Sequence, residues 1–259
     1  MFSSPLSQNT VHAAPLSEKA QDDTRQRLIL AAASVFGSQG FEGASTRRIA
    51  ALAGTNISSI AYHFGGKENL YLAVADYIAQ EIGKKVDEAE ALLADERERV
   101  KDGTLPPAAA IALLQRLWSE WLDKFLVNEK YDDDCDWAWF VIREEANPTE
   151  AFDRIYNASI VRFLNLLAEL IGCIQRRPAQ SLKVRLQAVL LFGTMLSFKR
   201  ERATVARYLG WKTLDETAQN TVRAAINEEV AHLLILSEET LSHCLIEAAD
   251  SKIHGDSYL

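Results

Sequence analysis

Between residues 45 and 69 the chain carries a group of polar side chains that could form hydrogen bonds with the edges of nucleic-acid bases. The segment reads STRRIAALAGTNISSIAYHFGGKEN. Amide, hydroxyl and imidazole groups both donate and accept hydrogen bonds, as base recognition in a major groove requires. The polar candidates are Asn56, Ser58, Ser59, Tyr62 and His63.

Basic side chains flank this polar group and could hold phosphates on either side of it. Arg47 and Arg48 precede the polar residues and Lys67 follows them. From Thr24 to Lys67 the only acidic residue is Glu42, although the net charge of the whole chain is −8. Local charge decides contact with phosphates, so a small basic site is compatible with an acidic protein. An ordinary helical hairpin with a solvated polar face is the alternative.

Two short helices joined by a tight turn must position these side chains. Their apolar residues, spaced by three and four, are Ile49, Leu52, Ala53, Ile57, Ile60 and Phe64,. Gly54 fits the turn because glycine readily adopts positive φ. Ser45 or Thr46 can cap the first helix and Asn56 the second. A helix-turn-helix of this kind can place its second helix in a major groove.

A preceding helix would complete a three-helix domain. It is predicted to begin at Asp22, Asp23 or Thr24 and to end at Gly40, with Phe41 packing back onto the domain,. Its inner face consists of Leu28, Ala31, Ala32, Val35 and Phe36. The predicted organisation is a flexible tail over 1–20, a helix-turn-helix domain over 21–66 and a larger helical domain over 67–259,.

Residues 27 to 71, RLILAAASVFGSQGFEGASTRRIAALAGTNISSIAYHFGGKENLY, resemble the N-terminal DNA-binding domain of the TetR/AcrR family of bacterial regulators. The resemblance implies DNA contacts from Ser45, Thr46, Ile57 and Ala61 in addition to the residues named above. The chain departs from the family at Ala61, where many members carry Tyr, and at Gly66, where Ser or Asp usually caps the next helix. Glycine is still an acceptable N-cap.

Downstream of this domain the sequence predicts only helices. An apolar stripe predicts a helix from Lys67 to Val100,. A linker follows over 102–107, and the next helix runs from Pro107 to about Asn128,. No strand pattern and no internal repeat of any length is present, so the predicted fold class is all-α.

Capping signals place the remaining helices. Asn147-Pro148-Thr149-Glu150 resembles a helix start, with Asn as the cap and Glu reaching back to it,. It predicts one helix ending near Ala146 and another from Pro148 to about Gln175. Ser181 can cap the next helix, and Thr213 to Glu216 form a capping box for the last one,. The runs REEANPTEAFDRIY and ARYLGW resemble the C-terminal domain of the CecR-like subgroup of TetR regulators.

The last two long helices are more apolar than one packed face requires. Leu190, Leu191, Phe192, Met195, Leu196 and Phe198 nearly encircle the first of them. Such a helix is either central in its domain or shared with another subunit. The family resemblance favours the second reading, a homodimer that presents two reading helices to an imperfect palindrome.

The family also implies a small-molecule effector bound in the C-terminal domain. The hypothesised pocket lies between helices that begin near Lys67, Pro107, Asp133 and Pro148. Its candidate lining residues are Trp118, Trp121, Trp137, Trp139 and Phe140, with Arg143 or Glu144 supplying polarity,. For each aromatic residue singly, packing in the core is the competing explanation.

Composition restricts the other possibilities. Cys135, Cys173 and Cys244 are odd in number and lack a CxxC spacing, which favours reduced cytoplasmic thiols,. The aspartates between residues 132 and 136 lack calcium-loop spacing and have no nearby His, so no metal and no cofactor is expected,. No apolar run approaches the length of a membrane span. The N-terminus lacks the features of a signal peptide.

Two other functions are alternatives to a DNA-binding repressor. Catalysis by His232, His243 and Cys244 is disfavoured, because adjacent helical residues point to different faces and no catalytic motif is present,. The other rival keeps the helix-turn-helix dimer but uses DNA as a platform for a protein partner. The residues do not specify the operator, the effector, the regulated genes or the sign of regulation.

Overall fold

The structure is a computed structural model that describes residues 18–126, 137–211 and 215–235. Every regular element in these residues is a helix, which confirms the predicted all-α class. The chain forms two compact units. The first combines the residues up to Ile78 with 136–154, and the second combines 79–135 with 155–259. The predicted tail over 1–20 lies almost entirely outside the described residues.

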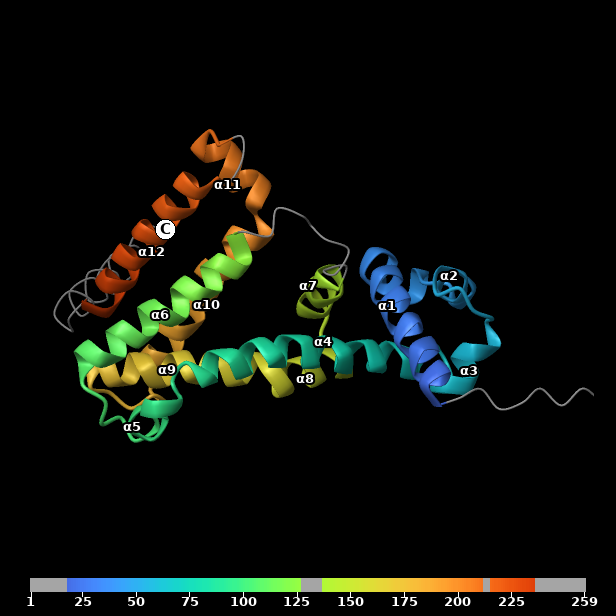
Figure 1. The fold of residues 1–259 in the computed structure, drawn as a ribbon, viewed down its shortest axis with the longest axis horizontal. Helices are drawn as coiled ribbons and strands as arrows, with labels where there is room; N and C mark the ends of the chain where they lie inside the picture. The colour runs from blue at the N-terminus through green and yellow to red at the C-terminus, as the bar shows by residue number, and fades with distance from the viewer. Residues whose placement is uncertain (1–17, 127–136, 212–214, 236–259) are drawn as a thin grey trace, which may run out of the picture. The chain divides into compact units, whose positions relative to one another are not determined.

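The first unit contains the helix-turn-helix. Its helices are α1 (Glu18–Gly43), α2 (Thr46–Leu52), α3 (Ser58–Phe64), the beginning of α4 (Lys67–Ala91), α7 (Ala138–Ala146) and the beginning of α8 (Glu150–Ile155) (Figure 1). The predicted inner face of α1 is buried throughout, from Leu28 to Phe36. Ile49, Ile60 and Leu70 complete this core from α2, α3 and α4.

Helix α1 begins earlier than the sequence predicted. Asp22, Asp23 and Thr24 lie inside the helix, so none of them is its cap. The predicted interruption at Gly40 is confirmed, since this residue has φ 74° and ψ 173°. One further helical turn follows to Gly43. Phe41 packs back as predicted, with its ring centroid 6.1 Å from that of Phe36.

The second unit has a single large core within its described residues. The elements of this unit are the end of α4, a 3₁₀ turn η1 (Ala94–Glu96), α5 (Arg97–Lys101), α6 (Pro107–Leu126), α9 (Val161–Gln175), α10 (Leu182–Arg200), α11 (Arg202–Leu209) and α12 (Glu216–Ile235). Trp118, Leu167, Leu170 and Val184 are fully or almost fully buried where α6, α9 and α10 pack together. Burial of this apolar cluster provides the main stabilisation of the unit.

The predicted helix from Lys67 to Val100 is wrong beyond Ala91. The chain leaves α4 at Leu92, passes through η1 and resumes as the short helix α5. This turn lets Leu93 and Val100 both enter the core, where each is 1% exposed. An apolar stripe reports which residues face the core but does not report whether the backbone stays straight between them.

The start of α8 also differs from the prediction. Helix α7 ends at Ala146 as predicted, but Asn147 does not cap the next helix. The capping groups are the Thr149 hydroxyl, which accepts from Ala151 N–H at 3.2 Å, and the Glu144 carboxylate, which accepts from Phe152 N–H at 3.1 Å. Glu150 instead accepts from the Arg154 guanidinium at 2.8 Å. Local sequence spacing could not reveal a cap supplied by the preceding helix.

Helices α8 and α9 are joined by a π-helical segment (Tyr156–Ile160) and form one continuous helix of 26 residues. By length and composition this helix could cross a membrane, contrary to the sequence expectation,. Half of its most apolar window is buried inside the protein, however, and Phe163, Leu167 and Ile171 belong to the core. Its apolarity is therefore that of a central core helix.

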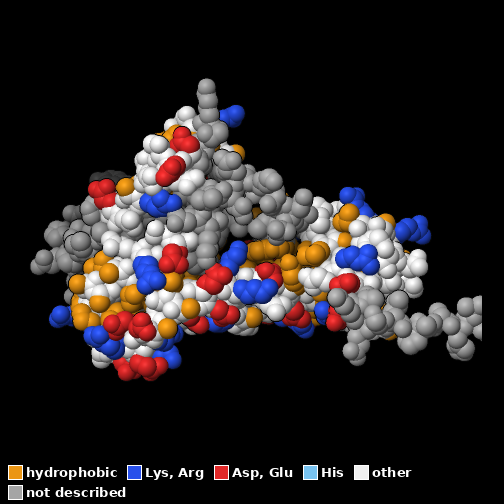
Figure 2. Space-filling view, viewed as in Figure 1, with side chains coloured by type: hydrophobic (Ala, Val, Ile, Leu, Met, Phe, Trp, Pro, Cys, Tyr) orange, Lys and Arg blue, Asp and Glu red, His pale blue; other side chains and the backbone are white. Residues whose placement is uncertain are grey.

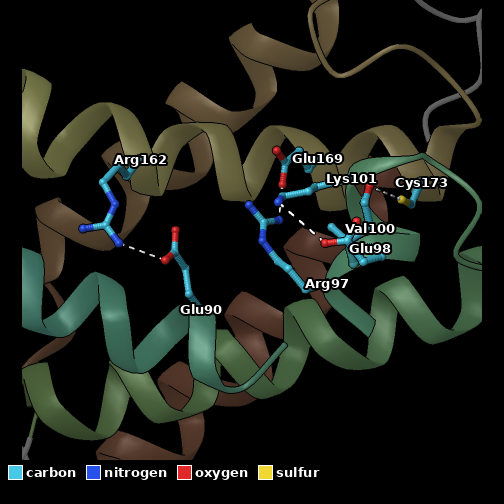
Figure 3. Close-up of polar contacts among 8 residues, drawn as sticks. All are labelled: Glu90, Arg97, Glu98, Val100, Lys101, Arg162, Glu169 and Cys173. Atoms are coloured by element: carbon cyan, nitrogen blue, oxygen red, sulfur yellow. Dashed lines mark hydrogen bonds and ion pairs between the residues drawn. The ribbon is translucent and has the colours of Figure 1, made fainter. Parts of the chain in front are cut away.

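Ion pairs attach α9 to the neighbouring helices of the second unit. Arg162 pairs with Asp87 at 2.7 Å. Arg162 also pairs with Glu90 at 2.8 Å, and Arg97 pairs with Glu169 (Figure 3). The Cys173 thiol donates to Val100 C=O at 3.5 Å. Burial raises the pKa of this thiol, which favours an unreactive protonated form,. Cys135 and Cys244 lie outside the described residues.

The last two described long helices begin close to the predicted positions. Ser181 occupies the N-cap position of α10, but its hydroxyl makes no capping hydrogen bond. At α12 the Asp215 carboxylate accepts from Ala218 N–H at 2.9 Å and is therefore the cap. Thr213, the predicted capping residue, lies outside the described residues.

Candidate nucleic-acid interface

The helix-turn-helix has one buried face and one exposed face. Ile60 and Phe64 hold α3 against the core, at 3% and 8% exposed. The opposite side of the segment is solvent-accessible and carries Asn56, Ile57, Ser58, Ala61 and Tyr62, with Ser59 and His63 half-buried. The predicted contact residues of α3 and its N-terminal turn thus share one accessible surface. Ser59 and His63, which are half-buried, lie at the margin of that surface.

The turn between the helices has the predicted geometry with a different cap. Gly54 adopts φ 63°, as expected for the residue that leaves α2. Helix α3 begins at Ser58 with Ile57 at its N-cap position, so Asn56 does not cap it and its amide remains on the exposed side. Instead, the Thr55 and Ser59 hydroxyls are 2.8 Å apart and share a hydrogen bond. This role of Thr55 was not predicted from the sequence.

Basic side chains surround the exposed face of α3. Arg47 and Arg48 are exposed on α2. The predicted cap of this helix is wrong: Ser45 occupies the N-cap position but its hydroxyl makes no capping hydrogen bond, and Thr46 is the first helical residue. Lys67, at the start of α4, places its ammonium group 4.5 Å from the centroid of the Phe41 ring,. In Figure 2 the charged side chains over the helix-turn-helix are mostly Lys and Arg.

Helix α1 contributes to this surface residues that are not among the DNA contacts predicted from the sequence. The Arg25 guanidinium lies 5.3 Å from the centroid of the Phe64 ring at the end of α3. Gln21 donates to the Tyr62 hydroxyl at 3.4 Å. The acid-poor run beginning at Thr24 was the available signal, but only the tertiary structure brings α1 beside α3. The surface can therefore contact phosphates from three helices.

The residues of the hypothesised pocket lie in both units. Trp118 is 1% exposed within the core of the second unit, and its indole N–H has no hydrogen-bond partner among the described residues. The side chain of Trp121 is not described. On α7 of the first unit, Phe140 is buried and Trp139 is 57% exposed, while Trp137 immediately precedes the helix. The pocket itself stays a prediction.

Arg143 and Glu144 make polar contacts within the first unit. The Arg143 guanidinium donates to Gly37 C=O at 2.7 Å and to Ser38 C=O at 3.0 Å. The Glu144 carboxylate is buried and accepts from Tyr71 and from the start of α8. From the sequence, both residues were expected only as polar groups for a ligand.

The described residues contain no cluster of three or more His, Cys, Asp or Glu side chains that could hold a metal ion. The aspartates at 132–136, together with His243 and Cys244, lie outside those residues. His232 belongs to α12, but its side chain is not described.

A helix-turn-helix with an exposed polar face and basic neighbours, followed by a second all-helical unit, is the arrangement of a helix-turn-helix transcriptional regulator. The chain belongs to the TetR family. Residues 28–74 match the family model described as bacterial regulatory proteins, tetR family. Residues 114–235 match the C-terminal domain of the HTH-type transcriptional dual regulator CecR. Both predicted resemblances are confirmed.

Individual relatives agree with this assignment. The chain is 32% identical to the HTH-type transcriptional dual regulator CecR of Shigella flexneri over 79% of this chain and 88% of the relative. It is 32% identical to the transcriptional repressor NicS of Pseudomonas putida, over 31% of this chain and 38% of that one. A TetR transcriptional regulator from Chloroflexus aurantiacus has the same fold, with a TM-score of 0.54 at 18% identity over 82% of this chain and 96% of the other.

Proposed function

We propose that this TetR-family regulator is a ligand-responsive cytoplasmic repressor that binds a palindromic operator as a homodimer and has no catalytic activity. The exposed polar face of α3, surrounded by Arg25, Arg47, Arg48 and Lys67, is the observation that carries the DNA-binding part of the proposal. Repression is supported by the names of relatives such as the repressor NicS. A repressor acts by blocking access of polymerase to the promoter.

The homodimer is supported by an exposed apolar stripe on α10. Val184, Ala188 and Leu191 bury one side of this helix in the core. The other side exposes large apolar side chains, namely Leu182 (82%), Leu186 (56%), Val189 (51%) and Leu190 (51%). Spacings of three and four place them along one face. A contiguous apolar face of this kind is typical of a protein interface.

A second copy of the chain is the partner that accounts both for the exposed apolar stripe and for DNA recognition by α3. A two-fold axis would pair the same face of α10 from both copies. It would also present two α3 helices to successive major grooves, about 34–36 Å apart. The operator is then an imperfect palindrome. A small molecule can change the affinity for this operator only if it binds the DNA-binding state and the non-binding state of the protein with different affinities.

The alternative function uses DNA as a platform for a protein partner. Selection of bound fragments from genomic DNA, footprinting and transcription with purified polymerase separate the two functions. A repressor lowers transcript yield from a promoter that contains the footprint, and a small-molecule inducer restores it. A footprint without any change in transcript yield would contradict repression.

Substitutions in the reading head should separate phosphate contacts from base contacts. Arg47→Ala should weaken binding to all duplexes and reduce the slope of log affinity against log salt by about 1. Asn56→Ala should change the preferred sequence, by about 1–3 kcal/mol at one base pair if a bidentate contact is lost.

Fluorescence anisotropy with duplexes substituted at each position, repeated at several salt concentrations, measures both effects. Arg116→Ala, an exposed arginine of α6 in the second unit, is the matched control and should leave both quantities unchanged. Equal losses on every duplex from Arg47→Ala and Asn56→Ala would contradict the separate roles.

A further inference from the structure

Helix α7 belongs to the same compact unit as the helix-turn-helix although it lies about a hundred residues further along the chain. It packs along α1. Two adjacent residues near its C-terminal end, Arg143 and Glu144, make polar contacts that reach α1, α4 and α8. Neither residue lies within the segment 28–74 that matches the family's DNA-binding domain.

Arg143 satisfies carbonyl groups where α1 is interrupted. The backbone turns out of the helix at Gly40, with φ 74°. A helix that stops loses the N–H groups that would have bonded its last carbonyls. The guanidinium supplies donors to two of them, those of Gly37 and Ser38, at 2.7 and 3.0 Å. A Cβ at position 40 would lie 3.5 Å from Nη1 of the same Arg143, so the arginine sits directly against this interruption.

Glu144 joins α7 to α4 and α8. Its carboxylate is 2% exposed and accepts from the Tyr71 hydroxyl, from Thr149 N–H at 3.1 Å and Oγ1 at 2.7 Å, and from Phe152 N–H at 3.1 Å. A buried carboxylate is tolerated when its oxygens are satisfied in this way. Burial and the bond to Glu144 raise the pKa of Tyr71 above its usual value, so its hydroxyl remains a donor.

An aromatic cluster connects these polar contacts to the DNA-binding surface. The Tyr71 ring lies 4.6 Å from Phe140 of α7, 4.8 Å from Phe36 and 5.1 Å from Phe41, measured between centroids. The Lys67 ammonium lies over the Phe41 ring, 4.5 Å from its centroid. The position of a candidate phosphate-binding lysine thus depends on rings that α7 helps to hold.

We propose that Arg143 and Glu144 are positioning residues for DNA binding: they hold the end of α1 and the start of α4 in the orientation that presents α2, α3 and Lys67 to DNA. The inference rests on the proposed DNA recognition by α3. Because Phe152 N–H of α8 and Thr149 N–H just before it bond to the same carboxylate, a shift of α8 against α4 would disturb the reading head. This gives a defined set of contacts through which the C-terminal part of the sequence can control DNA affinity.

The test compares Arg143→Ala, Arg143→Lys, Glu144→Gln and Tyr71→Phe in the full chain. Glu145→Gln is the matched control, because Glu145 is the exposed neighbour on the same helix. The probe is a DNA duplex that the unaltered chain has selected from a random-sequence library. Binding is measured by anisotropy at several salt concentrations, and thermal unfolding and amide hydrogen exchange are measured on the same samples.

Arg143→Ala should weaken binding about tenfold, a size typical of coupling within one contact network, with the salt slope unchanged because no phosphate contact is lost. Amides of residues 37–44 should exchange faster, and Arg143→Lys should recover part of the affinity. The double variant with Glu144→Gln and Tyr71→Phe should lose less DNA-binding free energy than the sum of the losses in the two single variants. Glu145→Gln should match the unaltered chain.

Two results would overturn the inference. One is binding by Arg143→Ala and Glu144→Gln that equals that of the unaltered chain. The other is weakened binding that disappears once affinities are corrected for the folded fraction, which would make the contacts purely stabilising. Failure of the unaltered chain to select any duplex is a different outcome, since it would overturn the DNA-binding assignment together with the inference.

Discussion

Replacing Leu186 with glutamate should convert the protein to a monomer and lower its affinity for a palindromic duplex at least about a hundredfold. Leu186 lies within the exposed apolar stripe of α10, where its side chain is 56% exposed. Two glutamates brought together across a two-fold axis would repel each other and lose their hydration. A monomer binds each half-site separately and loses the gain of about 10²–10⁴ that linked binding provides.

Sedimentation equilibrium gives the mass, and anisotropy gives the affinity for duplexes with one or two half-sites. Leu30→Glu is the control for oligomeric state, because Leu30 of α1 is similarly exposed, at 46%, but lies outside the α10 stripe. In the Leu186→Glu variant, the affinities for duplexes with one and with two half-sites should no longer differ. A variant that keeps the mass of the unaltered protein would show that α10 is not the interface.

Replacing Trp118 with alanine should lower the free energy of unfolding by about 3–5 kcal/mol. Trp118 is 1% exposed in the core where α6 packs on α9 and α10, so truncation leaves a large cavity. Trp118→Phe should cost less, because it retains most of the apolar volume and removes an indole N–H that has no partner among the described residues,.

Urea unfolding at a fixed protein concentration measures these differences, since dimerisation would otherwise shift the apparent stability. Trp139→Ala is the matched control. Its side chain is 57% exposed, and its loss should cost no more than about 1 kcal/mol,. Equal stability of the Trp118→Ala and Trp139→Ala variants would contradict a core role for Trp118.

The helix-turn-helix was predictable because its signals are local. The apolar spacing that ends with Ile60 and Phe64 and the positive φ required at Gly54 both act over a few residues,. The apolar excess of α10 was also visible in the sequence, but the residues that stay exposed were not: of those expected to encircle the helix, Leu190 lies in the exposed stripe, whereas Leu191 is buried in the core,. Helix ends were predicted less well, as at Asn147, because the group that caps a helix can come from another helix.

The amino-acid sequence by itself determined the helical class and the helix-turn-helix with its polar and basic side chains, since each follows from residue type and short-range spacing. Only the tertiary structure decided that α4 ends at Ala91, that Arg25 of α1 lies beside α3, and that Arg143 and Glu144 bond to the DNA-binding unit. Those outcomes depend on pairing groups up to about a hundred residues apart. Burial and hydrogen-bond satisfaction in the folded chain select such pairs, and no local pattern encodes them.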